Sequence, residues 1–88
     1  MKIFKYVIPL EGITHNIPAG ATFLSCQLQN KDIVGWYLVD PNSPSSVFQF
    51  TVLGTGHEVP EYLDERHYLS TLQITPVFVV HIFAQRTN

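Results

Sequence analysis

One stretch of this chain decides its fold, and it reads Val47-Phe48-Gln49-Phe50-Thr51-Val52-Leu53-Gly54-Thr55-Gly56-His57-Glu58-Val59-Pro60. Its first seven residues are rich in aromatic and β-branched side chains, which predicts a strand. Phe48, Phe50 and Val52 share one face of that strand, because side chains alternate between the two faces. The strand then stops at two glycines, which permit the backbone conformations of a turn. We therefore expect a strand that ends in a glycine turn, and this strand end is the first place to look for a site.

The chain before this stretch has further segments typical of strands, either in alternation or in aromatic and β-branched content. We expect these strands over residues 2–8, 13–17, 22–29 and 33–39. Asn30-Lys31-Asp32 is expected to join the last two as a hairpin. Because side chains alternate between the two faces, we expect Leu24, Cys26 and Leu28 to share one apolar face of the strand over residues 22–29. In the strand over residues 33–39, we expect Val34, Trp36 and Leu38 to point into the core.

After the glycine turn, residues 60–66 predict at most one short helical stretch, with proline at its first position. Residues 68–74 return to strand character. Residues 77–83 are apolar on both faces apart from His81, which is typical of a central strand or of one covered by a partner. Residues 84–88 are expected to be a polar tail. The fold class is therefore all-β: one domain over residues 1–88, a small antiparallel β-sandwich or barrel of six to seven strands with at most one short helical turn near 60–66.

The composition indicates a binding protein and excludes several other classes. Hydrophobic residues make up 45% and charged residues only 14% of the 88 residues, so we expect apolar surface to be covered by a second copy, another protein or a ligand. A net charge of −2 without a basic block argues against extended nucleic-acid binding. The single Cys26 cannot form an internal disulfide, which fits a reducing compartment. No signal peptide is recognisable, and the longest apolar run is too short to span a membrane.

The candidate ligand-binding turn is Gly54-Thr55-Gly56-His57. Its glycines bring backbone amides close to a bound group, and His57 could donate to an anion. It is neither a dinucleotide-binding fingerprint, since Val59 stands in the place of the third glycine, nor a phosphate loop, since no Gly-Lys-Ser/Thr ending follows. The alternative interpretation is a turn that only ends a strand, with His57 as its cap.

Other side chains add to this candidate site or have simpler explanations. Arg66 could supply a second donor, and Tyr37 or Tyr62 could stack on a base or anchor an interface. The four histidines show no metal-site spacing, so neither a metal nor a cofactor is predicted. We expect Cys26 to be a small buried hydrophobe and His81 to be half-buried and hydrogen-bonded. The acidic residues of the loop between 58 and 65 are expected to form a solvated face.

Several short motifs, in this order and spacing, resemble those of a family of short uncharacterised proteins encoded by bacteriophages and prophages. They are Met1-Lys2-Ile3-Phe4-Lys5-Tyr6, Phe23-Leu24-Ser25-Cys26-Gln27-Leu28-Gln29, Gly35-Trp36-Tyr37-Leu38-Val39-Asp40, Leu53-Gly54-Thr55-Gly56-His57 and Tyr68-Leu69-Ser70-Thr71. The resemblance implies a virus-encoded accessory protein in the cytoplasm of a bacterial host. Small phage proteins often antagonise host defence by binding: some sequester nucleotide signals as oligomers, and others block a host protein.

The sequence thus predicts a non-enzymatic protein with no catalytic residues, which acts by binding as a homo-oligomer. The first hypothesis is sequestration of a small anionic ligand such as a signalling nucleotide, with Gly54, Thr55, Gly56, His57, Arg66, Tyr37 and Tyr62 as the binding residues. The alternatives are a module that blocks a host protein and a minor virion or assembly protein.

Overall fold

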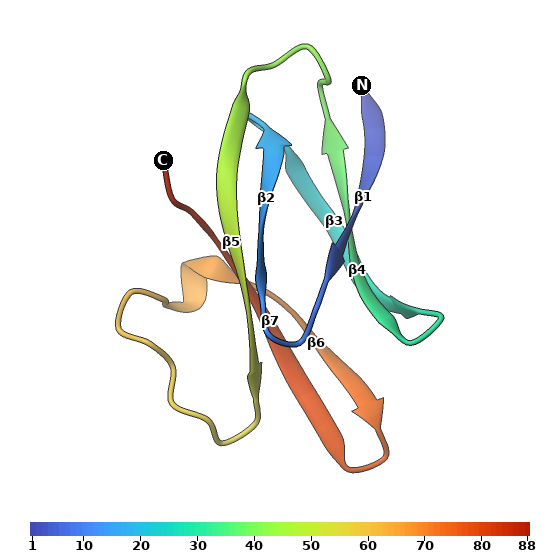
Figure 1. The fold of residues 1–88 in the computed structure, drawn as a ribbon, viewed down its shortest axis with the longest axis vertical. Coiled ribbons are helices and arrows are strands. Elements are labelled where there is room, and N and C mark those ends of the chain that lie inside the picture. Colours follow the sequence, from blue (N-terminus) through green and yellow to red (C-terminus); the bar gives the residue numbers. More distant parts are fainter.

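The computed structural model describes residues 1–88 and contains seven strands in two antiparallel sheets (Figure 1). One sheet has the order β1-β4-β3 and the other the order β2-β5-β7-β6. The strands are β1 (Lys2–Ile8), β2 (Ile13–Pro18), β3 (Thr22–Gln29), β4 (Asp32–Val39), β5 (Ser45–Gly54), β6 (Tyr68–Thr75) and β7 (Phe78–Arg86). The predicted all-β fold is confirmed, and the two sheets stay separate without closing into a barrel.

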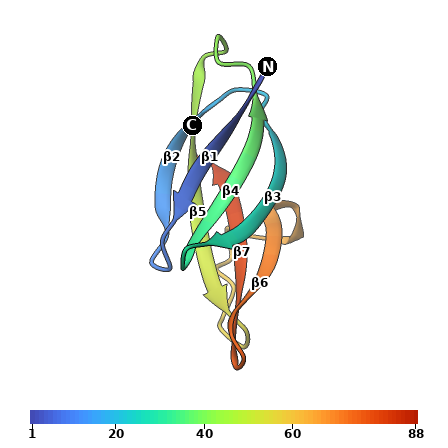
Figure 2. The ribbon, with the colours of Figure 1, turned by 90° about the vertical axis from the view of Figure 1, so that its right-hand side faces the viewer.

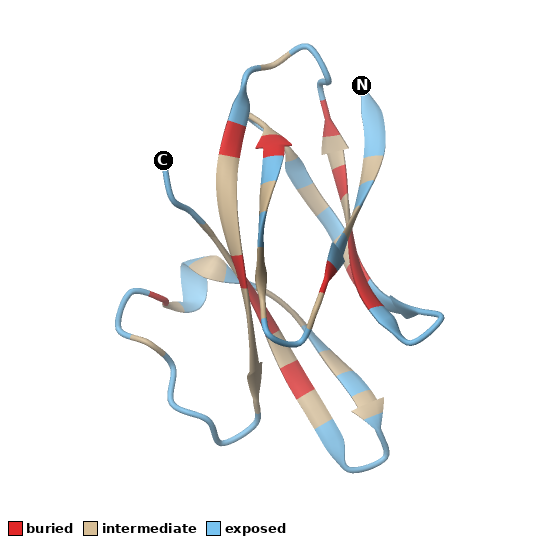
Figure 3. Cartoon of the chain, in the orientation of Figure 1, coloured by how far each residue is buried: buried red, intermediate tan, exposed pale blue.

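The core lies between the two sheets, one of which stands in front of the other in Figure 2. Phe50 of β5 is fully buried, and the edge of the Tyr37 ring from β4 faces it with the ring centroids 6.3 Å apart. Tyr37 also meets Phe23 at 5.4 Å and Tyr6 at 5.8 Å, so aromatic edges fill the space between the sheets. Burial raises the pKa of the Tyr37 hydroxyl. Figure 3 shows how the buried positions are spread over both sheets.

The face of β4 that points into the main core is the opposite of the predicted one, although Val34 on the predicted face is also fully buried. Tyr37 and Val39 are buried in the core with Ile33, whereas Trp36 points outward and is only half-buried. Gly35 lies on the core face, where Ile8 and Cys26 pack against its backbone. Both faces of β4 are equally apolar, so alternation alone could not distinguish them.

The predicted face of β3 is also corrected, because the strand contains a bulge. The pairing with β4 shifts between Phe23 and Ser25, which leaves Leu24 as the extra residue. Phe23 and Cys26 therefore both point inward although they are three residues apart, and Leu24 is 46% exposed. Cys26 is buried as predicted, and burial raises the pKa of its thiol to about 11.

Two features of the C-terminal part were predicted correctly and two were not. β7 is a central strand, between β5 and β6, as its apolar sequence indicated. The short helical turn exists but begins later than Pro60: it is a 3-10 helix at Glu65–His67 with Asp64 as its N-cap. The expected polar tail is instead strand and hydrogen-bonded chain, since Arg86 pairs with Phe48 and the Thr87 amide donates to the Val47 carbonyl.

Three of the connections lie at one end of the molecule, which we call the hairpin end. Figures 1 and 2 show the β1–β2 turn, the β3–β4 hairpin and the β6–β7 hairpin at this hairpin end, with β6–β7 projecting furthest, while both termini lie towards the other end. The β3–β4 turn places Asn30 at φ 51° and Lys31 at φ 76°, the pair of positive angles that a two-residue hairpin needs. The structure contains no helix that could cross a membrane.

Candidate functional site

The Gly54-Thr55-Gly56-His57 turn closes on itself through the His57 side chain. The Gly54 amide donates to Nδ1 of His57 at 3.1 Å, and the His57 amide donates back to the Gly54 carbonyl at 3.1 Å. The imidazole lies against Gly54 so closely that a Cβ there would be 3.0 Å from its Cε1 atom. Gly56 has φ 90°, a conformation that favours glycine. Each glycine therefore has a structural reason, and His57 caps the turn, as the alternative interpretation held.

The turn does not present a cluster of free amides. The Thr55 amide donates to the Val79 carbonyl at 3.3 Å, so only the Gly56 amide of the four is left for an external acceptor. Because Nδ1 of His57 accepts a hydrogen bond, the neutral ring carries its proton on Nε2, which gives a second available donor. The turn thus offers two donors to a bound group.

A chain of polar side chains crosses the outer face of the four-stranded sheet beside this turn. Thr55 Oγ1 lies 2.8 Å from His81 Nε2, His81 Nδ1 lies 2.9 Å from Thr71 Oγ1, and Thr71 Oγ1 lies 2.6 Å from the Tyr68 hydroxyl. The prediction that His81 is half-buried and hydrogen-bonded is confirmed. Its partners come from β6 and from the end of β5, so no local sequence signal could identify them.

The other predicted binding residues lie apart from the turn. Arg66 is bound to Asp64, with Nη2 and Oδ2 2.7 Å apart, and these hydrogen bonds lower the pKa of the Asp64 carboxyl to about 2. The Tyr62 side chain is 58% exposed, and its carbonyl accepts from Gln85. Tyr37 is in the core and is not available for stacking on a ligand. The structure therefore does not bring the predicted set together.

Two hollows flank the glycine turn. The larger, of about 380 Å³, lies between the turn and the tip of the β6–β7 hairpin, and its walls are Gly54, Thr55, His57, Val77, Phe78 and Val79. The smaller, of about 170 Å³, is on the side of His81 and Phe83. The hairpin tip is apolar, since Val77 is 93% and Phe78 39% exposed. Thr75 Oγ1 accepts from the amides of both residues, at 3.3 and 3.1 Å, which fixes the shape of the tip.

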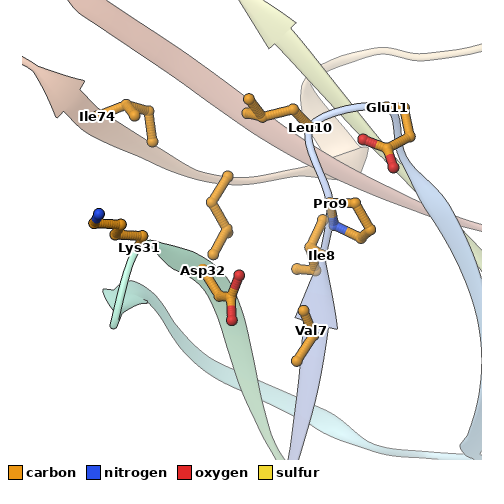
Figure 4. Close-up of a pocket in the computed structure, with 9 residues that line it drawn as sticks. Val7, Ile8, Pro9, Leu10, Glu11, Lys31, Asp32 and Ile74 are labelled. Carbon is orange, nitrogen blue, oxygen red and sulfur yellow. The ribbon is translucent and has the colours of Figure 1, made fainter.

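A groove that the sequence did not predict lies at the same end of the molecule (Figure 4). It has a volume of about 300 Å³ and lies between the β1–β2 turn, the β3–β4 hairpin and Ile74 at the end of β6. A second hollow beside it shares Lys31 and Ile74 and extends to Leu28 and Thr75. The walls come from three distant parts of the chain, which only the tertiary structure brings together.

The fold and these hollows define a small two-sheet β domain whose concave surfaces lie at the glycine turn and the neighbouring hairpins. No group of three or more His, Cys, Asp or Glu side chains is placed to hold a metal ion. The chain belongs to the family described as Domain of unknown function (DUF7352), which matches it over residues 1–88. No curated protein and no solved structure matches the chain.

Proposed function

We propose that this protein is a non-enzymatic, sandwich-like binding module that recognises another protein through its β6–β7 hairpin. The observation that carries the proposal is the exposed apolar tip, with Val77 93% and Phe78 39% exposed, next to the hollow of about 380 Å³ at the glycine turn. The two projecting apolar side chains can insert into a partner surface, and the hollow beside them can accept a side chain of the partner.

The tip is already ordered for binding. The two hydrogen bonds to Thr75 Oγ1 hold the turn, and Gln73 Nε2 donates to the Pro76 carbonyl at 3.1 Å from the same hairpin. A turn held in this way loses little conformational entropy when a partner covers it, and this favours affinity.

The biological setting of the proposal comes from the resemblance to phage-encoded proteins. We propose a partner in the cytoplasm of a bacterial host, blocked by this protein during infection, and self-association of the protein itself. Exposed apolar residues of the edge strand β3, such as Leu24 and Leu28, support self-association. Light scattering after size exclusion measures it directly, and a monomer at every concentration contradicts it.

The test of protein recognition compares tip and control variants. Tagged wild-type protein, Val77→Glu and Ile3→Glu are used for affinity capture from bacterial lysate. Ile3 is the control because it is 61% exposed and lies in the outer sheet face near the N-terminus. We expect Val77→Glu to lose specific partners that wild type and Ile3→Glu retain. Equal capture by all three proteins would contradict recognition through the tip.

The second candidate function is sequestration of a small anionic ligand such as a signalling nucleotide, favoured by the two donors at Gly56 and His57. The groups lie beside hollows of about 380 and 170 Å³, so a phosphate could be contacted there with part of its ligand outside. Titration with a panel of cyclic and linear nucleotides, followed by calorimetry, tests this function. Binding that His57→Ala abolishes supports it, and the absence of heat for every nucleotide removes it.

A further inference from the structure

The groove between the β1–β2 turn and the β3–β4 hairpin has apolar walls and a charged rim. Its walls are formed by Val7, Ile8, Pro9, Leu10, Ile33 and Ile74. Ile8 and Ile33 belong to the core, so the groove opens directly over the end of the core. A bound group would therefore replace water on an apolar surface that the fold leaves open.

Two carboxylates stand on the rim without a partner. Glu11 and Asp32 make no ion pair, since both ion pairs of the protein involve Asp64. Lys31 directly precedes Asp32 on the hairpin, but Figure 4 shows its side chain extending away from both carboxylates. The three charged groups of the rim thus leave an excess of negative charge beside the apolar walls.

This combination selects one ligand chemistry: an aliphatic stem that ends in a cation. Lysine and arginine bury their methylene stems on apolar surface while the charged head seeks a carboxylate. An anionic group would meet two like charges at Glu11 and Asp32, and an uncharged aliphatic group would leave both carboxylates without a partner. We propose that the groove binds a lysine or arginine side chain presented by the partner protein, an inference that rests on the proposed protein recognition.

Peptide probes test the groove without knowledge of the partner. The probe is acetyl-Gly-Leu-Lys-Leu-Gly-amide, and two controls carry norleucine or glutamate in place of lysine. In a nuclear magnetic resonance titration we expect saturable shifts at Leu10, Ile33 and Ile74 with the lysine peptide. The norleucine peptide, which keeps the stem and lacks the charge, should bind about tenfold more weakly. Equal binding of both peptides would overturn charge recognition.

Matched variants identify the carboxylates. Glu11→Gln with Asp32→Asn removes both charges at almost constant shape, and Glu58→Gln with Glu61→Gln is the control in an exposed loop outside the groove. We expect the first pair to lose lysine-peptide binding about tenfold and the second pair to retain it, with both folded by their amide spectra. Unchanged binding in the Glu11/Asp32 pair would overturn the inference.

Lysate capture with the same variants separates this inference from the proposed function. Capture that depends on Val77 but not on Glu11 and Asp32, without peptide binding, overturns the groove and leaves recognition by the tip intact. If the lysine peptide binds at the groove but Val77→Glu captures the same proteins as wild type, recognition by the tip is overturned and the groove inference stands. A dimer that dissociates in the Glu11/Asp32 pair would assign the groove to a second copy and overturn the inference of a different partner.

Discussion

In the candidate site, the His57 ring lies directly against Gly54. We therefore predict that the effects of substitutions at these two positions on the free energy of unfolding are not additive. Gly54→Ala places a Cβ 3.0 Å from Cε1 and 3.2 Å from Nδ1 of His57, so the ring must move away. That movement lengthens the 3.1 Å hydrogen bond from the Gly54 amide. In His57→Ala the ring and this bond are both absent, and alanine at position 54 then has no clash with the ring.

The magnitudes follow from the hydrogen bond. Its loss costs about 1 kcal/mol, so His57→Ala should lower the free energy of unfolding by about 1 kcal/mol and Gly54→Ala by about 1–2 kcal/mol. The double variant should resemble His57→Ala alone, because the second change then disturbs nothing further. The coupling free energy between the two positions is therefore expected to equal the cost of Gly54→Ala, about 1–2 kcal/mol in magnitude.

Urea unfolding of the four proteins measures this cycle, with the fluorescence of the single Trp36 as the signal. Equal slopes against urea show that all four unfold over the same surface, which makes the midpoints comparable. If Gly54→Ala costs as much in the His57→Ala background as in wild type, the contact between Gly54 and the ring is not what stabilises the turn.

Three further predictions use features elsewhere in the fold. Lys31→Gly should raise the melting temperature, because Lys31 has φ 76° and relief of this conformation contributes about 1 kcal/mol; an unchanged or lower melting temperature contradicts this. The pKa of Cys26 is raised from 9.0 to about 11, so the unfolded chain ionises first and stability should fall by about 1.4 kcal/mol per pH unit in that range; Cys26→Ala should show a smaller slope. The pKa of Asp64 is lowered from 3.8 to about 2, so its contribution to folding stability is fully present above pH 3.8 and is lost as the pH falls towards 2. Carbon-detected titration of Arg66→Gln should find the pKa of Asp64 raised, and an unchanged pKa excludes Arg66 as the cause.

The strands themselves were predictable wherever one face is clearly apolar or the sequence is strongly β-prone. The bounds of β3 and the central position of β7 agree with the structure. The errors arose from information that is not local. The two faces of β4 carry similar residues, so packing against rings from other strands, such as Phe50 and Phe23, selects Tyr37 over Trp36. The bulge at Leu24 and the pairing of Arg86 with Phe48 depend on neighbouring strands.

The candidate site was predictable in position but not in chemistry. The glycines correctly marked a turn at the end of β5, with hollows on both sides. Whether the amides of that turn are free depends on Val79, which lies more than twenty residues further along the chain and accepts from Thr55. The Glu11 and Asp32 groove gave no signal at all, because each carboxylate by itself is an ordinary turn residue.

The placement of both termini away from the hairpin end has a practical consequence for assembling the molecule into larger objects (Figure 1). A solid support, a fluorescent protein or a multimeric scaffold attached through either terminus would hold the domain at the end opposite the hairpins. The β6–β7 hairpin would then be directed outward. Arrays made in this way would display many hairpin tips in one orientation, and the strength of their capture could be raised by valency without altering a residue at the tip.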